Sequence, residues 1–303
     1  MTGAGGMPVE VRGLVKTYGP IRAVDQVDLT VEPGDIYGYL GPNGAGKTTT
    51  LRMLLGLIRR DGGSVALFGR DPARGIEALE HVAGFVESPT FYPYLSGREN
   101  LQLFGALDGG VDRTRVDEVL EQVELRNRAR DRVGTYSLGM RQRLGIAAAL
   151  LRDPKLLILD EPANGLDPAG IRDMRTLIAN LPDRGVTVLY SSHLLAEVEE
   201  VCTRVAIVHD GRIAFEGRLD ELRGSFGISY RLETADDQAA TTAARDLEVS
   251  IAVADGGLSL EADPSAIDRL TVELGRRGIA IRYLARQQRS LEDLFFQLTE
   301  EAS

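Results

Sequence analysis

The chain has 303 residues, 43% of them hydrophobic and 26% charged, and its formal net charge is −10. This length suggests one large domain with a smaller one, or two ordinary domains. The acidic balance argues against a nonspecific nucleic-acid partner, because binding nucleic acid requires a basic face that displaces counterions. The single cysteine, Cys202, excludes an internal disulfide, fits a reducing compartment and reads as a small buried side chain.

The sequence predicts no membrane span. Its longest unbroken apolar run, Ile146–Leu151, is far shorter than the roughly 20 residues that a spanning helix needs. Met1–Gly6 lacks the basic patch and the following apolar stretch of a signal peptide. If the protein acts at a membrane, we therefore expect another chain to cross it.

In chain order, predicted strands alternate with predicted helices through the first two thirds of the sequence. Strands are predicted at Val9–Tyr18, Val24–Val31, Ile36–Leu40, Ser64–Phe68, Val82–Val86, Leu156–Leu159 and Val186–Tyr190. A helix is predicted at Thr48–Leu57, and Arg204–Gly217 reads as a hairpin that turns at Asp210 and Gly211. This alternation indicates parallel strands with crossover helices, an α/β sandwich, into which a mostly helical stretch from about 96 to 152 is inserted.

The composition shifts near Gly224, which predicts a main domain at 1–224 and a small α+β accessory domain at 225–303. Helix caps are predicted at Asp263, with Pro264 at the first helical position, and at Ser290. The accessory strands are predicted at Ile228–Glu233, Val249–Val253, Leu258–Glu261 and Ile279–Leu284, the middle two joined around Gly256 and Gly257. The last helix carries an apolar stripe that reads more readily as core than as interface, formed by Leu291, Leu294, Phe295 and Leu298.

Eight residues after the strand Ile36–Leu40 match the phosphate-binding loop G-x-x-x-x-G-K-[ST]: Gly41, Pro42, Asn43, Gly44, Ala45, Gly46, Lys47 and Thr48. The glycines let successive backbone N–H groups face an anion, and the following helix adds its positive N-terminal end. We expect Lys47 to reach the β- and γ-phosphates of ATP, and Thr48 to ligate Mg²⁺. The alternative, a plain glycine-rich turn, is disfavoured by the flanking strand and helix.

The strand Leu156–Leu159 delivers two adjacent carboxylates, Asp160 and Glu161. Sheets of α/β proteins hold their ligands at the carboxyl ends of the strands. We expect Asp160 to hold Mg²⁺ and Glu161 to polarise the attacking water as a general base. An apolar strand that ends in Asp-Glu is common by itself, so this prediction depends on the phosphate-binding loop.

Two further segments join the set: Tyr136–Gln142 lies shortly before that strand, and Ser192-His193 ends the next one. Together the four motifs resemble the ABC ATPase family from about Val9 to Gly217. The resemblance implies an α/β fold with a P-loop NTPase (RecA-like) core, an antiparallel β subdomain and a helical insertion. It also implies ATP and Mg²⁺ as cofactors and a pair of nucleotide-binding domains that enclose ATP.

The resemblance assigns roles by position. Tyr18 would stack on adenine, although it also reads as an exposed aromatic at a strand end. Ser137 and Gly139 would contact the γ-phosphate of ATP held by the other subunit, and Asp167 would lie in the loop that links the two sites. His193 would contact the γ-phosphate and position the water, although it also reads as the neighbour of a helix cap. Ser137 is independently predicted to cap a helix whose N-terminus is an anion site.

The predicted site residues fall into three groups. The catalytic residues are Lys47, Glu161 and His193, and the metal ligands are Thr48, Asp160 and Glu87. The nucleotide-binding residues are Tyr18, Gly41, Pro42, Asn43, Gly44, Ala45, Gly46, Lys47, Thr48, Thr49, Glu87, Ser137, Gly139 and Asp167.

The sequence departs from the family pattern at two places. Glu87 stands where the family usually has a Gln that touches Mg²⁺ and senses the membrane subunit, and a carboxylate binds Mg²⁺ more strongly but repels phosphate. Leu138 and Met140 stand where Gly and Gln are common. Four features together resemble the ATPases of bacitracin- and lantibiotic-resistance exporters and related drug-efflux systems. They are Glu87, the segment Ser137–Met140 (the signature segment), the stretch Phe91–Leu101 and the ending Ser290–Phe295.

The favoured hypothesis is the ATPase subunit of an ABC exporter that pairs with a second copy across ATP. It would dock peripherally on the cytoplasmic face of a separate transmembrane permease, without a nucleic-acid partner. Two alternatives are a soluble ABC-type ATPase that acts on DNA or ribosomes, and a binding module that no longer hydrolyses ATP. The single cassette without a coiled coil argues against the first, and the filled catalytic positions argue against the second.

Overall fold

The computed structural model describes residues 6–225, 229–254, 257–287, 291 and 295. Contacts within the chain divide it into two units, one of which ends at Arg218 while the other begins at Leu219. The sequence predicted the boundary at residue 224, which lies inside helix α7, Leu219–Ser225. Each unit has a hydrophobic core of its own.

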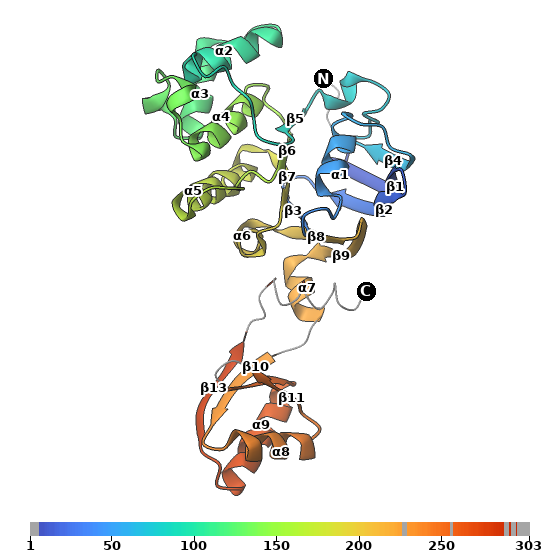
Figure 1. Ribbon diagram of the computed structural model, residues 1–303, viewed down its shortest axis with the longest axis vertical. Coiled ribbons are helices and arrows are strands. Elements are labelled where there is room, and N and C mark those ends of the chain that lie inside the picture. The colour runs from blue at the N-terminus through green and yellow to red at the C-terminus, as the bar shows by residue number, and fades with distance from the viewer. Residues whose placement is uncertain (1–5, 226–228, 255–256, 288–290, 292–294, 296–303) are drawn as a thin grey trace. The chain divides into compact units, whose positions relative to one another are not determined.

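The larger unit is built on a six-stranded sheet (Figure 1). In spatial order its strands are β5 (Val82–Phe85), β6 (Leu156–Asp160), β7 (Thr187–Ser192), β3 (Ile36–Leu40), β8 (Arg204–His209) and β9 (Arg212–Arg218). The first five run parallel, and β9 returns antiparallel to β8 as the predicted hairpin. The parallel order confirms the predicted α/β fold and brings the carboxyl ends of β3, β5, β6 and β7 to one edge of the sheet.

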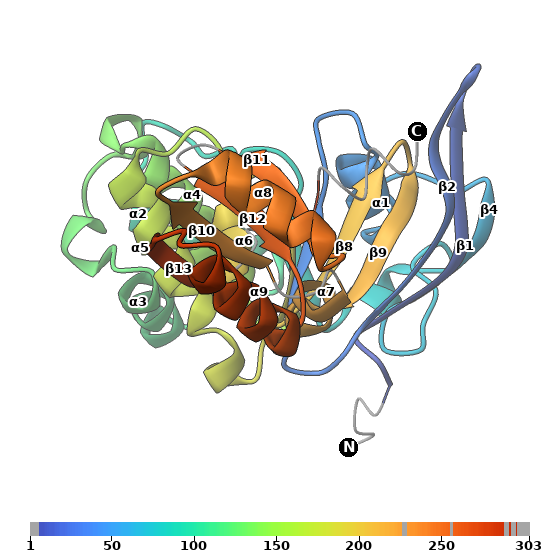
Figure 2. The same ribbon diagram turned by 90° about the horizontal axis from the view of Figure 1, so that it is seen from below.

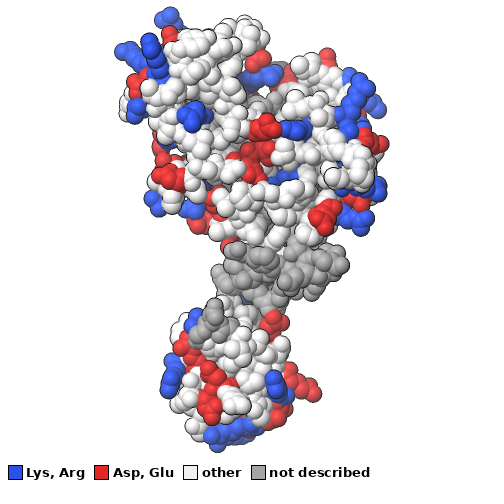
Figure 3. All heavy atoms as spheres, viewed as in Figure 1, with Lys and Arg blue, Asp and Glu red and all other residues white. Residues whose placement is uncertain are grey.

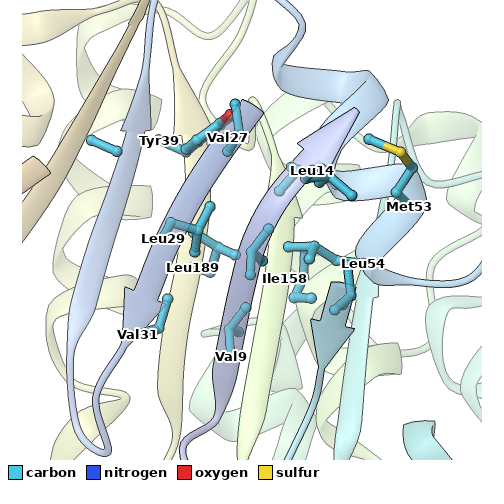
Figure 4. Packing of buried hydrophobic residues seen from close by; sticks show 14 of the residues in the cluster. Val9, Leu14, Val27, Leu29, Val31, Tyr39, Met53, Leu54, Ile158 and Leu189 are labelled. Atoms are coloured by element: carbon cyan, nitrogen blue, oxygen red, sulfur yellow. The ribbon is translucent and has the colours of Figure 1, made fainter. Parts of the chain in front are cut away.

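A second, antiparallel sheet confirms the predicted β subdomain (Figure 2). Its strands, in spatial order, are β2 (Ile21–Val31), β1 (Val9–Tyr18) and β4 (Gly62–Ala66). Side chains of β1 and β2 pack against the larger sheet and helix α1 in one buried cluster that includes Leu14, Leu54, Ile158 and Leu189 (Figure 4). Burying each such leucine or isoleucine contributes about 1.5–3 kcal/mol. This core holds the connection between β3 and α1, the phosphate-binding loop, between the two sheets.

The helices of the larger unit are α1 (Lys47–Leu54), α2 (Gly97–Leu107), α3 (Arg113–Gln122), α4 (Leu138–Leu150), α5 (Pro168–Ala179) and α6 (Leu195–Val201). Short 3₁₀ helices lie at Ile76–Leu79, Arg126–Arg128, Val133–Thr135 and Pro182–Arg184. Helices α2, α3 and α4 gather at one end of the unit (Figure 1). Helix α1 ends before its predicted end at Leu57, because Gly56 adopts the left-handed φ of 67° that terminates helices.

After helix α7, the smaller unit has the β-α-β-β-α-β order of ferredoxin-like folds. Its elements are β10 (Ser229–Thr234), α8 (Asp237–Asp246), β11 (Ser250–Ala254), β12 (Gly257–Glu261), α9 (Pro264–Arg276) and β13 (Ile281–Gln287), and the antiparallel sheet has the order β11-β12-β10-β13. All four predicted strands are present, and Asp263 caps α9 as predicted through its side chain and the Ala266 N–H (2.9 Å).

Two parts of the smaller unit differ from, or lie outside, what the sequence analysis covered. Helix α8 was not predicted, because it is buried through Ala240, Ala243 and Ala244 rather than through large apolar side chains. In the predicted last helix, Leu291 is buried. The other predicted features Gly256, Ser290, Leu294 and Leu298 lie outside the described residues.

Candidate functional site

The phosphate-binding loop connects the buried strand β3 to α1 and closes tightly on itself. Gly46 has a φ of 97°, and a Cβ atom there would lie 2.2 Å from the Ala23 carbonyl oxygen, so only glycine fits. The Lys47 side chain is buried and donates hydrogen bonds to the carbonyl oxygens of Gly41 (2.7 Å) and Pro42 (3.2 Å). The ammonium group therefore lies over its own loop, where a bound phosphate would meet it.

A buried polar contact fixes α1 on β3. The hydroxyls of Tyr39 on β3 and Thr50 on α1 are 3.2 Å apart, and both side chains are fully buried or nearly so. Burial raises the pKa of the Tyr39 phenol, so the group stays neutral. The contact orients α1, and with it the loop at its N-terminus.

The two predicted carboxylates meet the phosphate-binding loop at the carboxyl end of β6. Thr48 Oγ1 donates to Asp160 Oδ2 at 2.8 Å. Lys47 Nζ lies 3.2 Å from Glu161 Oε1, and His193 Nδ1 lies 3.1 Å from Glu161 Oε2. The structure thus brings five of the predicted residues into one connected cluster, in which both oxygens of Glu161 are engaged.

Ser191, which the sequence analysis did not select, ties the two carboxylates together. Its buried hydroxyl donates to Asp160 Oδ1 (2.5 Å) and accepts a hydrogen bond from the Glu161 backbone N–H (3.0 Å). Glu161 has a left-handed φ of 45°, which a residue with a side chain adopts only when its surroundings impose it. The sequence does contain a signal for this role. A residue with a hydroxyl group stands near the end of β7, the strand that neighbours the one ending in Asp160.

Glu87 forms an ion pair with Arg52, a second residue that the sequence analysis did not select. Arg52 lies in the last turn of α1, and Glu87 follows β5 with a φ of 71°. The Glu87 side chain is 68% exposed. The predicted metal ligand Glu87 therefore contacts the cation Arg52, whereas the other two predicted ligands, Thr48 and Asp160, contact each other.

The start of α4 packs against the loop before α5. Ser137 caps α4 as predicted, because its side chain accepts from the Met140 N–H at 3.2 Å. A Cβ on Gly139 would contact the Leu166 side chain, and one on Gly165 would contact Leu138. Asp167 caps α5 by accepting from the Gly170 N–H at 3.0 Å. The signature segment and the Asp167 loop thus form one surface within the chain.

One cavity joins these elements. It is lined by Asn43, Thr48, Glu87, Ser88, Leu138, Gln142, Asp160, Glu161 and Asn164. Gln142 is 4% exposed, and its Oε1 has no hydrogen-bond partner. Tyr18 does not line this cavity; it is 46% exposed at the end of β1, with Lys16 Nζ 5.4 Å from the centre of its ring.

The oxygen atoms of the cavity suit Mg²⁺ better than a metal whose coordination shell consists of protein side chains alone. Thr48 and Asp160 present a hydroxyl and a carboxylate in contact, which is the sparse set that Mg²⁺ accepts when waters and substrate phosphates complete its shell. Among the described residues, no group of three or more His, Cys, Asp or Glu side chains converges on one point. The residues present therefore fit Mg²⁺ bound together with a phosphate-bearing substrate.

A close contact joins α4 to the segment that carries Glu87. A Cβ on Gly145 would lie 2.6 Å from Pro89 Cγ and 3.3 Å from the Phe85 ring. Glycine at this position lets α4 rest directly on the end of β5 and the residues after it.

Comparison with known proteins places this arrangement in a family. A family model described as ABC transporter matches residues 24–164. The bacitracin transport ATP-binding protein BcrA of Bacillus licheniformis is 40% identical over 298 residues, which cover 96% of this chain and 96% of that protein. The chain belongs to the ABC transporter ATP-binding proteins.

Two further comparisons extend the relationship of this ABC ATPase. The daunorubicin/doxorubicin resistance ATP-binding protein DrrA of Streptomyces peucetius is 38% identical over 96% of this chain and 92% of its own length. A solved dimeric post-hydrolysis state of an ATP-binding cassette, bound to ADP and Pi, is 25% identical with a TM-score of 0.63 and covers 70% of this chain and 98% of that one. The predicted fold, the ATPase assignment and the resemblance to bacitracin and drug-efflux ATPases are thereby confirmed.

The ABC ATPase has no helix among its described residues that is long and apolar enough to cross a membrane. On the face that Figure 3 shows, Lys and Arg side chains are interspersed with Asp and Glu rather than gathered into one basic area.

Proposed function

We propose that this ABC ATPase drives the export of antimicrobial peptides or drugs through a separate transmembrane permease. In this proposal it docks peripherally on the cytoplasmic face of the membrane and works as a pair of copies with ATP and Mg²⁺ between them. The printed functions of the relatives, bacitracin transport and daunorubicin/doxorubicin resistance, support the exporter assignment. The dimeric state of the related cassette supports the pairing.

The observation that carries the proposal is the connected cluster of Lys47, Thr48, Asp160, Glu161 and His193. Lys47 and the N–H groups of the loop would bind the β- and γ-phosphates of ATP. Thr48 and Asp160 would hold Mg²⁺, which when bound neutralises charge on the phosphate oxygens. Tyr18, Thr49 and Glu87 are proposed to complete the site on the side of this chain.

Glu161 is proposed as the general base. In the structure its Oε1 lies 3.2 Å from the Lys47 ammonium, and this ion pair occupies the oxygen. When Lys47 turns toward the phosphates, Oε1 is released and accepts a proton from the attacking water. His193, 3.1 Å from the other oxygen, keeps the carboxylate oriented. The base would thus become available only after the substrate has bound.

The signature residues are proposed to act on the nucleotide of the second copy. Ser137 and Gly139 lie in the first turn of α4, where helical N–H groups and the positive end of the helix attract anions. Asp167 would lie where the loop before α5 meets the other subunit. Each nucleotide would then be bound by the loop of one copy and the α4 N-terminus of the other.

The substitution Glu161→Gln tests this proposal, with Glu200→Gln as the matched control. Glu200 lies on α6 in the same unit, is 58% exposed and pairs with Arg175, which is 26% exposed. We expect Glu161→Gln to lower the hydrolysis rate at least about 100-fold and to accumulate a dimer in ATP and Mg²⁺, measured by light scattering after gel filtration. Unchanged hydrolysis, or a monomer at saturating ATP, would contradict the proposed base and the proposed pairing.

The exporter assignment has a separate test in cells. Co-expression of the ATPase with a candidate transmembrane permease should raise resistance to a peptide antibiotic or an anthracycline. Glu161→Gln should abolish this gain while Glu200→Gln keeps it. An ATPase that stays out of the membrane fraction in the presence of that permease would instead favour a role away from membranes.

A further inference from the structure

Two acidic residues follow neighbouring strands at the same level of the sheet. Phe85 on β5 is paired with Leu159 on β6, and Glu87 and Glu161 each lie two positions beyond that pair. Both residues have a left-handed φ, of 71° and 45° respectively. Both line the same cavity together with Asp160. Three carboxylates therefore share a space that has to admit a polyphosphate.

Helix α1 provides a cation for each of the two outer carboxylates. Lys47 lies 3.2 Å from Glu161, and Arg52 forms an ion pair with Glu87. Thr48, which contacts Asp160, lies four positions before Arg52, so the two side chains are on the same face of α1. Side chains on one face of α1 thus contact acidic residues at the ends of both β5 and β6.

The pair between Arg52 and Glu87 contributes little to holding the fold together. The two side chains are 36% and 68% exposed, and ion pairs with that access to water have small effects on stability. Near a bound polyphosphate its effect is different, because an unpaired carboxylate at short range repels the substrate. When Lys47 turns toward the phosphates, Arg52 is the lysine or arginine side chain that an ion pair still joins to a cavity carboxylate among the described residues.

We propose that Arg52 is a positioning residue whose role is to neutralise Glu87 so that the cavity accepts the nucleotide. This inference rests on the nucleotide site proposed above. Arg52 acts through Glu87 and does not itself touch the substrate. A chain with a carboxylate at position 87 therefore depends on a cation one helical turn beyond Thr48, and a chain with an amide there does not.

Four variants test the inference: Arg52→Gln, Glu87→Gln, the double variant, and the control Arg70→Gln. Arg70 forms a comparably exposed ion pair with Glu80 in the same unit, at 57% and 59% exposure, and lines no part of the cavity. The readout is the equilibrium dissociation constant of methylanthraniloyl-ATP with Mg²⁺, measured by fluorescence at low and high salt. Melting temperatures without nucleotide check that each variant is folded.

We expect Arg52→Gln to weaken binding about 10-fold at low salt and less at high salt, because salt screens the unpaired carboxylate. KM should rise in parallel, with kcat changed much less. In the Glu87→Gln background, the same loss of Arg52 should alter binding by less than about 3-fold, since the charge it neutralises is gone. Arg70→Gln should bind as the wild type does.

Two results would overturn the inference: wild-type affinity in Arg52→Gln, or an equal loss of affinity with and without Glu87. Lys47→Ala separates this failure from failure of the site. If Lys47→Ala loses binding while Arg52→Gln does not, the proposed site stands and the role of Arg52 falls. If Lys47→Ala binds nucleotide like the wild type, the site itself is wrong.

Discussion

Ser191 offers the sharpest test of how the carboxylate pair is held. Ser191→Ala removes a hydrogen bond to the Asp160 carboxylate and another from the Glu161 N–H, both inside the protein. A bond to a charged group is worth about 1.5–3 kcal/mol and a neutral one about 0.5–1.5 kcal/mol, so the larger unit should lose roughly 2–4 kcal/mol of unfolding free energy. For a unit of this size that loss lowers the melting temperature by roughly 5–15 °C.

The same change should reduce hydrolysis in a protein that remains folded. If about half of the lost free energy had oriented Asp160 and Glu161, kcat/KM falls roughly 5- to 30-fold. The assays are differential scanning calorimetry and steady-state phosphate release well below the new melting temperature. The control is Ser192→Ala, which removes the neighbouring hydroxyl, a group that accepts only the Leu194 N–H (2.9 Å) and contacts neither carboxylate. Equal effects of the two substitutions would refute the reasoning, because only Ser191 bridges the acidic pair.

Three further predictions follow from the geometry. Gln142→Met replaces a buried carbonyl that lacks a partner, so the melting temperature should rise by roughly 2–4 °C, and a fall would show that this oxygen is satisfied. Burial raises the pKa of the Cys202 thiol to about 12, so the thiolate is scarce at pH 8. A disulfide reagent should therefore label the chain only after denaturation, and rapid labelling of the folded protein would contradict this. Gly46→Ala places a Cβ 2.2 Å from the Ala23 carbonyl in a left-handed conformation, so nucleotide binding measured by fluorescence should disappear, whereas Gly185→Ala, in a left-handed turn with open space, should bind normally.

The sequence predicted the elements of this chain wherever large apolar side chains or loop motifs mark them. The strands of both units and the cap at Asp263 belong to this class, because their signals are local. Helix α8 was missed because alanines form its buried face, and alanine spacing does not stand out from a polar background. Helix α1 ended early at Gly56, a turn signal that the apolar spacing outweighed.

In the site, motifs predicted five residues that the structure brings together, but not the contacts between distant segments. Ser191 reaches Asp160 across 31 positions of the chain, and Arg52 reaches Glu87 across 35. Those pairings depend on which strands are neighbours and on their register, which a single sequence does not record. The sequence therefore raised the question of how a carboxylate at position 87 is tolerated near phosphate, and the answer required the fold.

The direct contact between Gly145 and Pro89 has a mechanical consequence. A helix that lies against a proline ring without an intervening side chain is closely packed there, and close-packed surfaces transmit strain from one to the other. Ser137 caps the N-terminal end of this helix, α4, and the exposed Asp153 lies just beyond its C-terminal end. Enlarging residue 145 would insert a side chain between α4 and the segment after β5, and would alter the orientation of the α4 N-terminus in the proposed pair.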